Sequence, residues 1–222
     1  MPITISGSGT ITGLTTGGLP DGSIAAGDLA DNAVTDGKLA TTLDLTGKTV
    51  TLPSGTGGKI LQVVTQRYPN ATTVSITGGS HTDVGFSVDI TPTTSDSVML
   101  VAYSLMGETG AAPWDTMAAF SRTISGTRTV VVTTDGYGSR NPGIIAMGES
   151  HGNSDNSSTP GIFVMPLFPD TGRPANTNTI TYAPTVYHAS NMTFAINRTI
   201  SDGDNSSYER GMSWITVMEV AA

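Results

Sequence analysis

The stretch Ser97-Val-Met-Leu-Val-Ala-Tyr-Ser-Leu105 carries apolar side chains on both of its alternating faces. Successive residues of a strand point to opposite faces of a sheet, so a strand with two apolar faces has to be covered on both sides. A second sheet can cover one face, and a neighbouring subunit can cover the other. The stretch therefore predicts a strand of a β-sandwich that is covered on both faces, and a monomer would leave an apolar patch exposed on it.

Seven other segments are predicted to be strands, because they are rich in β-branched and aromatic residues and end at Gly, Pro, Asn or Asp. Helical periodicity is almost absent. Only residues 114–120 could form a helical turn, and their Pro113-Trp114-Asp115 start suits a loop equally well. Eight strands without intervening helices predict an all-β head, an antiparallel sandwich with a jelly-roll-like fold. The seven segments are residues 59–66, 82–90, 128–133, 162–165, 179–182, 192–197 and 214–220.

The first quarter of the chain differs in composition from the rest. No Phe, Tyr or Trp precedes Tyr68, and the segment consists mostly of Gly, Thr, Ser, Ala, Asp and isolated aliphatic residues. Such a segment cannot by itself bury enough apolar surface to outweigh the entropy of ordering its backbone. We expect residues 1–58 to form an extended, low-complexity shaft and residues 59–222 to form the head, with a hinge at residues 53–58.

The shaft contains a ten-residue repeat. Residues 22–30 align with residues 32–40 so that an aliphatic residue, a Gly, a Leu and an Ala recur at a constant offset. One unit has too few large apolar side chains to enclose a core, whereas identical chains side by side can pool them around a shared axis. A flexible linker is the alternative. The predicted trimer contacts of the shaft are Ile24, Leu29, Val34 and Leu39.

Charge, cysteine content and hydropathy argue against several classes of partner. The 222 residues carry a formal charge of −8, and the ten basic residues are scattered singly, which disfavours nucleic acid as a partner. No cysteine is present, so disulfides and thiolate metal sites cannot hold the fold. No stretch approaches the roughly 18 apolar residues of a membrane span, and residues 1–7 lack the features of a signal peptide. We expect no membrane insertion and no export through a signal peptide.

Motifs for catalysis and metal binding are incomplete. Residues 148–152, Gly-Glu-Ser-His-Gly, match the nucleophile elbow of α/β-hydrolases, and Asp170 and His188 follow in the order of a triad around Ser150. The elbow needs a helix after its serine, which the polar residues 153–161 cannot form. Residues 202–205 lack the pattern of an EF-hand loop, and the three histidines lack ligand spacing. We therefore predict a non-enzymatic protein without metal or cofactor, with a serine-dependent esterase as the weaker alternative.

The Gly/Thr-rich start, the repeat at residues 30–40, residues 58–64, residues 82–92 and the final residues 214–222 occur together in this chain. This combination resembles the fibre proteins of tailed bacteriophages, particularly those of cyanobacterial and marine hosts. The resemblance implies a homotrimer that is assembled into the virion in the host cytoplasm. Its shaft would fasten to another virion protein through residues 1–20, and its jelly-roll-like head would face the host. The head loops that match no pattern of the family are residues 107–116, 135–161 and 168–178.

Host binding is predicted for exposed residues of the head loops. An aromatic ring beside Gly, Pro, Asn or Ser can stack on a sugar face, while Asn and Arg can donate hydrogen bonds to hydroxyl groups. The candidates that would bind a host surface polysaccharide are Trp114, Tyr137, Arg140, His151 and Tyr208. Packing of Trp114 and Tyr208 at a subunit interface is the alternative. The predicted function is that of a phage tail fibre, with a capsid-decorating head fibre as the main alternative and a cellular adhesin as a weaker one.

Overall fold

The computed structural model describes residues 24–30, 33–35, 59–111, 114–132, 141–146, 160–206 and 208–222. Contacts divide the chain into two units, Met1–Ser54 and Gly55–Ala222. In the described part of the first unit, the chain forms a 3-10 turn, η1 (Ala26–Asp28), and the Asp28 carboxylate accepts a hydrogen bond of 2.8 Å from the backbone N–H of Ala25. Gly58, after which the boundary between shaft and head is predicted, lies outside the described residues, so that boundary stays a prediction.

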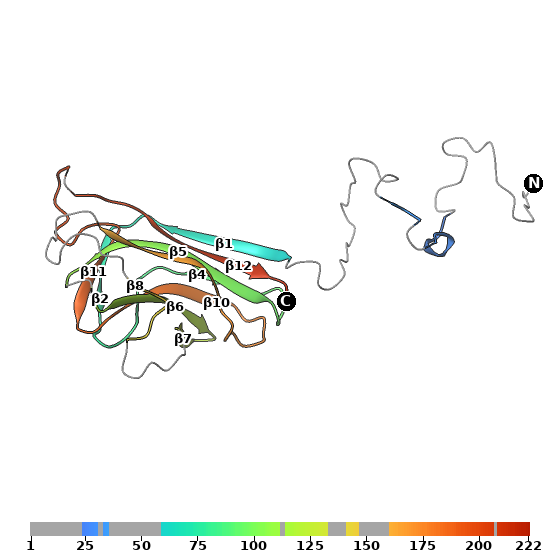
Figure 1. The fold of residues 1–222 in the computed structure, drawn as a ribbon, viewed down its shortest axis with the longest axis horizontal. Coiled ribbons are helices and arrows are strands. Elements are labelled where there is room, and N and C mark those ends of the chain that lie inside the picture. The colour runs from blue at the N-terminus through green and yellow to red at the C-terminus, as the bar shows by residue number, and fades with distance from the viewer. Residues whose placement is uncertain are drawn as a thin grey trace, which may run out of the picture. The chain divides into compact units, whose positions relative to one another are not determined.

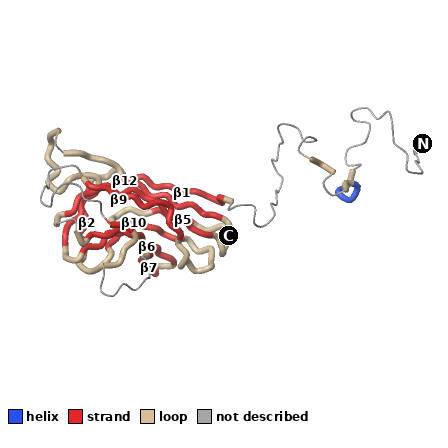
Figure 2. Tube along the Cα trace, viewed as in Figure 1, coloured by secondary structure: helices blue, strands red, loops and turns tan. Residues whose placement is uncertain are grey.

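The second unit is an antiparallel β-sandwich of two sheets (Figure 1). The two layers are evident in Figure 2, where β1, β5, β9 and β12 lie above β6, β7 and β10. No α-helix occurs in the described residues. The predicted all-β antiparallel fold class is confirmed. Sheet A consists of β1 (Ile60–Tyr68), β2 (Thr72–Ile76), β5 (Val98–Thr109), β9 (Gly161–Pro169), β11 (Met192–Ile196) and β12 (Ser213–Val220); sheet B consists of β3 (Thr82–Asp83), β4 (Val88–Ile90), β6 (Thr116–Ile124), β7 (Thr127–Val131), β8 (Ile145–Ala146) and β10 (Ile180–His188).

Strand β5 is central in sheet A. Its residues Val98 to Ser104 pair with β12, and its residues Leu100 to Gly107 pair with β9. Because β12 and β9 share part of this span, they must lie on opposite edges of β5. β1 extends the sheet beyond β12, whereas β11 pairs with the last residues of β5 and carries β2. Residues 98–105 of β5 are therefore flanked by strands on both sides.

The core lies between the inner faces of the two sheets. On β5 the inward side chains, Met99, Val101, Tyr103 and Leu105, are fully buried. The Tyr103 hydroxyl donates a hydrogen bond of 2.8 Å across the core to the backbone oxygen of Ala119 on β6. Burial raises the pKa of Tyr103, so its hydroxyl stays a neutral donor. One face of β5 is thus covered by the second sheet.

The possible helical turn at residues 114–120 is not formed. Strand β6 begins at Thr116 and pairs with β10 along its whole length and with β7 from Phe120 onward. The run Met117-Ala-Ala-Phe favours a helix only weakly, and pairing on both edges with burial of both faces overrides such a preference. The two-residue turn into β7 uses Ser125 and Gly126, whose φ angles of 48° and 81° suit the tight turn that a twisted hairpin requires.

Other predicted segments differ from the structure at their ends. The predicted strand at residues 82–90 is split into β3 and β4, because Gly85 has a φ of 82° that interrupts the extended backbone. The strands predicted at residues 162–165 and 179–182 continue to Pro169 and His188. The predicted loop at residues 107–116 is shorter, since β5 continues to Thr109 and β6 begins at Thr116.

Candidate functional site

Sheet A exposes an apolar outer face, meaning the side chains of β1, β12, β5 and β9 that point away from the core. The strand register aligns these side chains in rows across the sheet. One row joins Val63, Met218 and Leu100, and the row beside it joins Ile60, Val220 and Val98. Rows of apolar side chains on an outer surface are what the sequence predicted for β5, and the structure extends them over three more strands.

The large side chains of this outer face remain accessible in a single chain. Val63 on β1 is 51% exposed, and Val164 and Leu167 on β9 are 55% and 51% exposed. Trp214 on β12 is partly exposed on the same face. The apolar character of β9 on this side was missed in the sequence, although Ile162 and Val164 alternate there with the buried Phe163 and Met165.

Charge is scarce on the outer face of sheet A. In the described rows that join the four strands, Arg67 is the charged residue, opposite Trp214. The acidic residue of β12, Glu219, points inward, where its carboxylate accepts hydrogen bonds from Gln62 and Thr93 at 2.6 and 2.8 Å. Burial acts to raise the pKa of Glu219, but these hydrogen bonds and one from Ser97 outweigh it and lower the pKa. Glu219 therefore stays charged inside the head and adds no charge to the outer face.

The head has two ends that the strand register defines. The chain enters at Ile60, which pairs with Val220, and the nine-residue strand β1 ends at Tyr68, which pairs with Ser213. The loops from β5 to β6 and from β11 to β12 lie at the Tyr68 end (Figure 1). At about 3.3 Å per residue, this end is about 26 Å from the start of β1. We call it the distal end.

Two predicted host-binding residues come to the distal end. Trp114 lies in the β5–β6 loop and is 55% exposed, and Tyr208 lies in the β11–β12 loop and is partly exposed. Tyr137, Arg140 and His151 lie outside the described residues, so their placement stays a prediction. The sequence identified Trp114 and Tyr208 as loop residues, and the structure adds that both loops open at the same end of the sandwich.

A hollow of about 500 Å³ in the β11–β12 loop has Tyr208 in its wall, together with Gly203, Asp204, Asn205 and Arg210. A Cβ atom at Gly203 would lie 2.6 Å from the Tyr208 ring, so only glycine lets the ring lie this close to the backbone. An aromatic ring, an amide, a carboxylate and a guanidinium together form a set of groups that suits a polyhydroxylated ligand.

Asp202 organises the wall of this hollow. Its carboxylate accepts a hydrogen bond of 2.6 Å from Arg198 and pairs with Arg210 at 2.8 Å. Its backbone N–H donates to the Thr199 hydroxyl at 3.0 Å. The hydrogen bond from Arg198, with the charge of Arg210, lowers the pKa of Asp202 below its ordinary value. The loop is therefore held by an ionised carboxylate.

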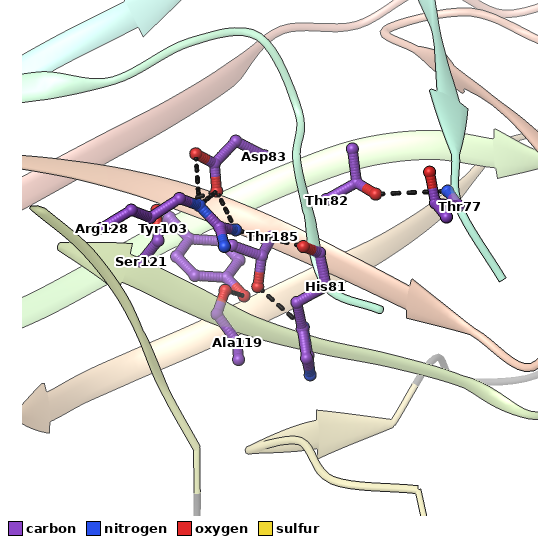
Figure 3. A network of polar contacts seen from close by, with 9 residues as sticks. All are labelled: Thr77, His81, Thr82, Asp83, Tyr103, Ala119, Ser121, Arg128 and Thr185. Atoms are coloured by element: carbon purple, nitrogen blue, oxygen red, sulfur yellow. Dashed lines mark hydrogen bonds and ion pairs between the residues drawn. The ribbon is translucent and has the colours of Figure 1, made fainter. Parts of the chain in front are cut away.

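A polar network crosses the outer face of sheet B (Figure 3). Arg128 donates to the Asp83 carboxylate at 2.7 and 3.0 Å, and Ser121 donates to the same carboxylate at 2.8 Å. His81 must donate from Nε2 to the backbone oxygen of Pro142 at 2.9 Å, so its Nδ1 accepts from the Thr185 hydroxyl at 2.9 Å. The network links β3, β6, β7 and β10.

The tautomer of His81 is consistent with its electrostatics. Burial lowers the pKa of His81, and the charge of Arg128 adds to this effect. Together they outweigh the hydrogen bond to Pro142 and the attraction of Asp83, which act in the opposite direction. His81 is thus a neutral hydrogen-bonding residue of sheet B near neutral pH.

The structure does not assemble the Asp170–His188 part of the esterase motif. Asp170 forms an ion pair with Arg122 and accepts a hydrogen bond of 2.8 Å from the Tyr182 hydroxyl. Tyr182 lies near the start of β10 and His188 at its end, about 20 Å apart along the strand. His188 instead forms hydrogen bonds with the backbone of Ser190. Ser150 lies outside the described residues.

The described residues contain no group of three His, Asp or Glu side chains that could hold a metal ion. Within the same described segments, no helix has the length and apolar character needed to cross a membrane. Of the four predicted shaft contacts, Ile24, Leu29 and Val34 are 54%, 47% and 50% exposed. Leu39 lies outside the described residues. The aliphatic side chains of the repeat that can be placed are thus accessible for contact with another chain.

No protein-family model matches the chain, and no curated protein matches it. Among solved structures, it is similar to the structure of infectious bursal disease virus strain Gx, with 15% identity and a TM-score of 0.29, covering 78% of this chain and 45% of that one. It is also similar to the VP2 subviral particle of infectious bursal disease virus, with 13% identity and a TM-score of 0.28, covering 83% of this chain and 50% of that one. The chain spans about half the length of these two proteins.

Proposed function

We propose that this chain is a non-enzymatic structural protein of a virion, a homotrimeric tail fibre of a bacteriophage that presents its β-sandwich head to the host. The observation that carries the proposal is the exposure of the aliphatic side chains of the repeat. Ile24, Leu29 and Val34 are each about half exposed in one chain, although they recur with a fixed period. Association of three copies around an axis would remove them from water and supply the core that the repeat lacks.

The layout of the head supports an anchor at one end and host contact at the other. The predicted shaft precedes the start of β1 in sequence, and Trp114 and Tyr208 lie in loops at the distal end. If residues 1–20 fasten the fibre to another virion protein, the distal loops are the part of the head presented outward. Host surface polysaccharide is the ligand class that suits the groups in these loops.

The native mass of the full chain tests the trimer. With 22.8 kDa per chain, we expect three times that mass, 68.4 kDa, in light scattering coupled to size exclusion. Replacing Val34 with Asp should weaken the trimer, because it places three like charges near one axis. Thr35→Asp is the matched control, since Thr35 is a polar neighbour in the same repeat. A full chain that stays at 22.8 kDa over the accessible concentration range would contradict the proposal.

Replacing Tyr208 with Ala should weaken binding of the full chain to an array of bacterial surface polysaccharides. The expected loss is roughly 2- to 10-fold, the scale of one aromatic stacking contact. Tyr208→Phe is the control, because it retains the ring and removes only the hydroxyl. Loss of the trimer in Tyr208→Ala would assign Tyr208 to a subunit interface, and unchanged binding on every polysaccharide that the native chain binds would exclude its ring from the site.

A further inference from the structure

We infer that the heads of three copies of this chain pack against one another through the outer face of sheet A. The inference rests on the proposed trimer and names the contact surface within the head. The two outer faces of the sandwich differ sharply in chemistry, and this difference indicates which of them faces water.

Sheet B has a polar outer face whose groups satisfy one another. Asp83 accepts hydrogen bonds from Ser121 and Arg128, and Thr181 donates to Asp89 at 2.6 Å. These residues lie on β3, β4, β6, β7 and β10, so the pattern covers most of the sheet. Figure 3 shows the part around Asp83, Ser121 and Arg128. Such a face is compatible with water, and no partner is needed to cover it.

Sheet A shows the opposite pattern in the two rows nearest the start of β1, whereas the next row pairs Thr65 with Thr216, whose hydroxyl oxygens are 2.8 Å apart. Val63, Met218 and Leu100 stand side by side, and Pro169 of β9 continues their row. Another row runs from Arg67 through Trp214 and Ser104 to Val164. Ala102 and Ser104 are small, so the centre of the face is recessed. At Ser104 the larger neighbours are Trp214 of β12 and Val164 of β9. A broad apolar surface with small central residues suits close packing against another chain.

The outer face of sheet A is large enough to form much of a specific protein–protein interface. Four strands about 4.8 Å apart, with four rows of outward side chains about 6.7 Å apart, cover about 500 Å². The largest apolar patches on monomers measure about 300–600 Å² and are often functional. A standard interface buries about 800 Å² on each partner, so this face accounts for the greater part of one subunit's contribution.

Charge and connectivity favour further copies of this chain as the occupant. Three chains carry three times −8, a total of −24, so copies repel wherever their acidic residues come together. The outer face of sheet A, with Arg67 as the charged residue in its described rows, is a surface where they can meet with little repulsion. β1 carries one edge of the face and follows the predicted shaft directly in sequence, and a trimeric shaft would hold three heads at a high effective concentration.

Trp214 provides a probe for this contact. The chain has two tryptophans, so Trp114→Phe leaves Trp214, which lies on the outer face, as the remaining one. In the full-length Trp114→Phe chain at the trimer mass, we expect Trp214 to be protected from acrylamide quenching. Adding Val164→Asp should abolish that protection, whereas Thr129→Asp on the exposed strand β7 should preserve it. Val164 is 55% exposed in one chain, so the substitution leaves the core intact.

Each outcome separates the inference from the proposed function. The inference is overturned if the trimer forms but Trp214 is freely quenched in it, and if Val164→Asp changes neither the quenching nor the mass. The predicted shaft would then still explain the trimer. A monomeric full chain would overturn both. Val63→Asp on β1 is the second variant, and circular dichroism confirms that each variant is folded. Loss of Trp214 protection in both folded variants, with protection retained in Thr129→Asp, is the result that supports the inference.

Discussion

Replacing Arg122 with Met should lower the free energy of unfolding of the head by about 3–5 kcal/mol. Arg122 on β6 forms an ion pair with Asp170, whose side chain is fully buried at the end of β9, and it also donates to the backbone oxygen of Gly172. Without the guanidinium, Asp170 keeps the hydrogen bond from Tyr182 but loses its counter-charge in a low-dielectric surrounding. Urea unfolding of the full chain, followed by circular dichroism, measures the effect.

Arg128→Met is the matched control for this substitution. Arg128 pairs with Asp83 on the outer face of sheet B, where both side chains are 37% exposed. Water screens this pair, so we expect a loss of about 0–1 kcal/mol. If Arg122→Met costs no more than Arg128→Met, then Asp170 is not an uncompensated buried charge in the variant. The double substitution Arg122→Met and Asp170→Asn should recover part of the loss, because it also removes the charge that Arg122 neutralises.

Replacing Phe120 with Ala should also destabilise the head by about 3–5 kcal/mol. Phe120 on β6 is fully buried, and its ring lies edge-on to Tyr182 at 5.8 Å and to Phe168 at 6.2 Å between ring centroids. The truncation removes the apolar transfer energy of the ring and leaves a cavity that the rigid sheets cannot fully close. Thermal and urea unfolding of the full chain measure the loss.

A second substitution, Phe120→Leu, tests whether the cavity causes the loss of stability. Phe120→Leu keeps most of the apolar volume, so its loss should be clearly smaller than that of Phe120→Ala. Equal losses in the two variants would show that edge-on ring contacts, and not the cavity, dominate. Because Phe168 belongs to β9, Phe120→Ala should in addition loosen the strand that carries Val164, and Trp214 should become more accessible to quencher in the assembled chain.

The sequence was most informative where the alternation of apolar residues within one segment is enough to predict a strand. Residues 97–105 predicted a strand with two apolar faces, and the structure places it at the centre of sheet A with its inner face in the core. Strand β6 was not predicted, because its Met117-Ala-Ala-Phe run has no clear preference and becomes a strand only by pairing with β10 and β7. Strand β2 was missed for a similar reason, since its Thr-rich segment pairs with β11.

The candidate sites divide in the same way. Trp114 and Tyr208 could be identified from their neighbours as exposed loop residues, and both described loops are exposed or partly exposed. Their placement at the same end of the sandwich could not be predicted, because it depends on how the 93 residues between them fold. The partnership of Arg122 with Asp170 was likewise hidden, since 48 residues separate them in the chain. The sequence offered Asp170 only within the weaker esterase alternative, and the structure does not bring it together with His188.

By itself, the sequence determined the class of the fold and the need for a second surface on β5, because alternation along one strand is a local property of the chain. It also determined the ten-residue repeat and the lack of aromatic residues before Tyr68, from which we expect a segment unable to enclose its own core. Only the tertiary structure decided which strands lie beside β5, and so how far the apolar outer face extends. The reason is that register and sheet order follow from long-range packing of many side chains at once, which no single segment encodes.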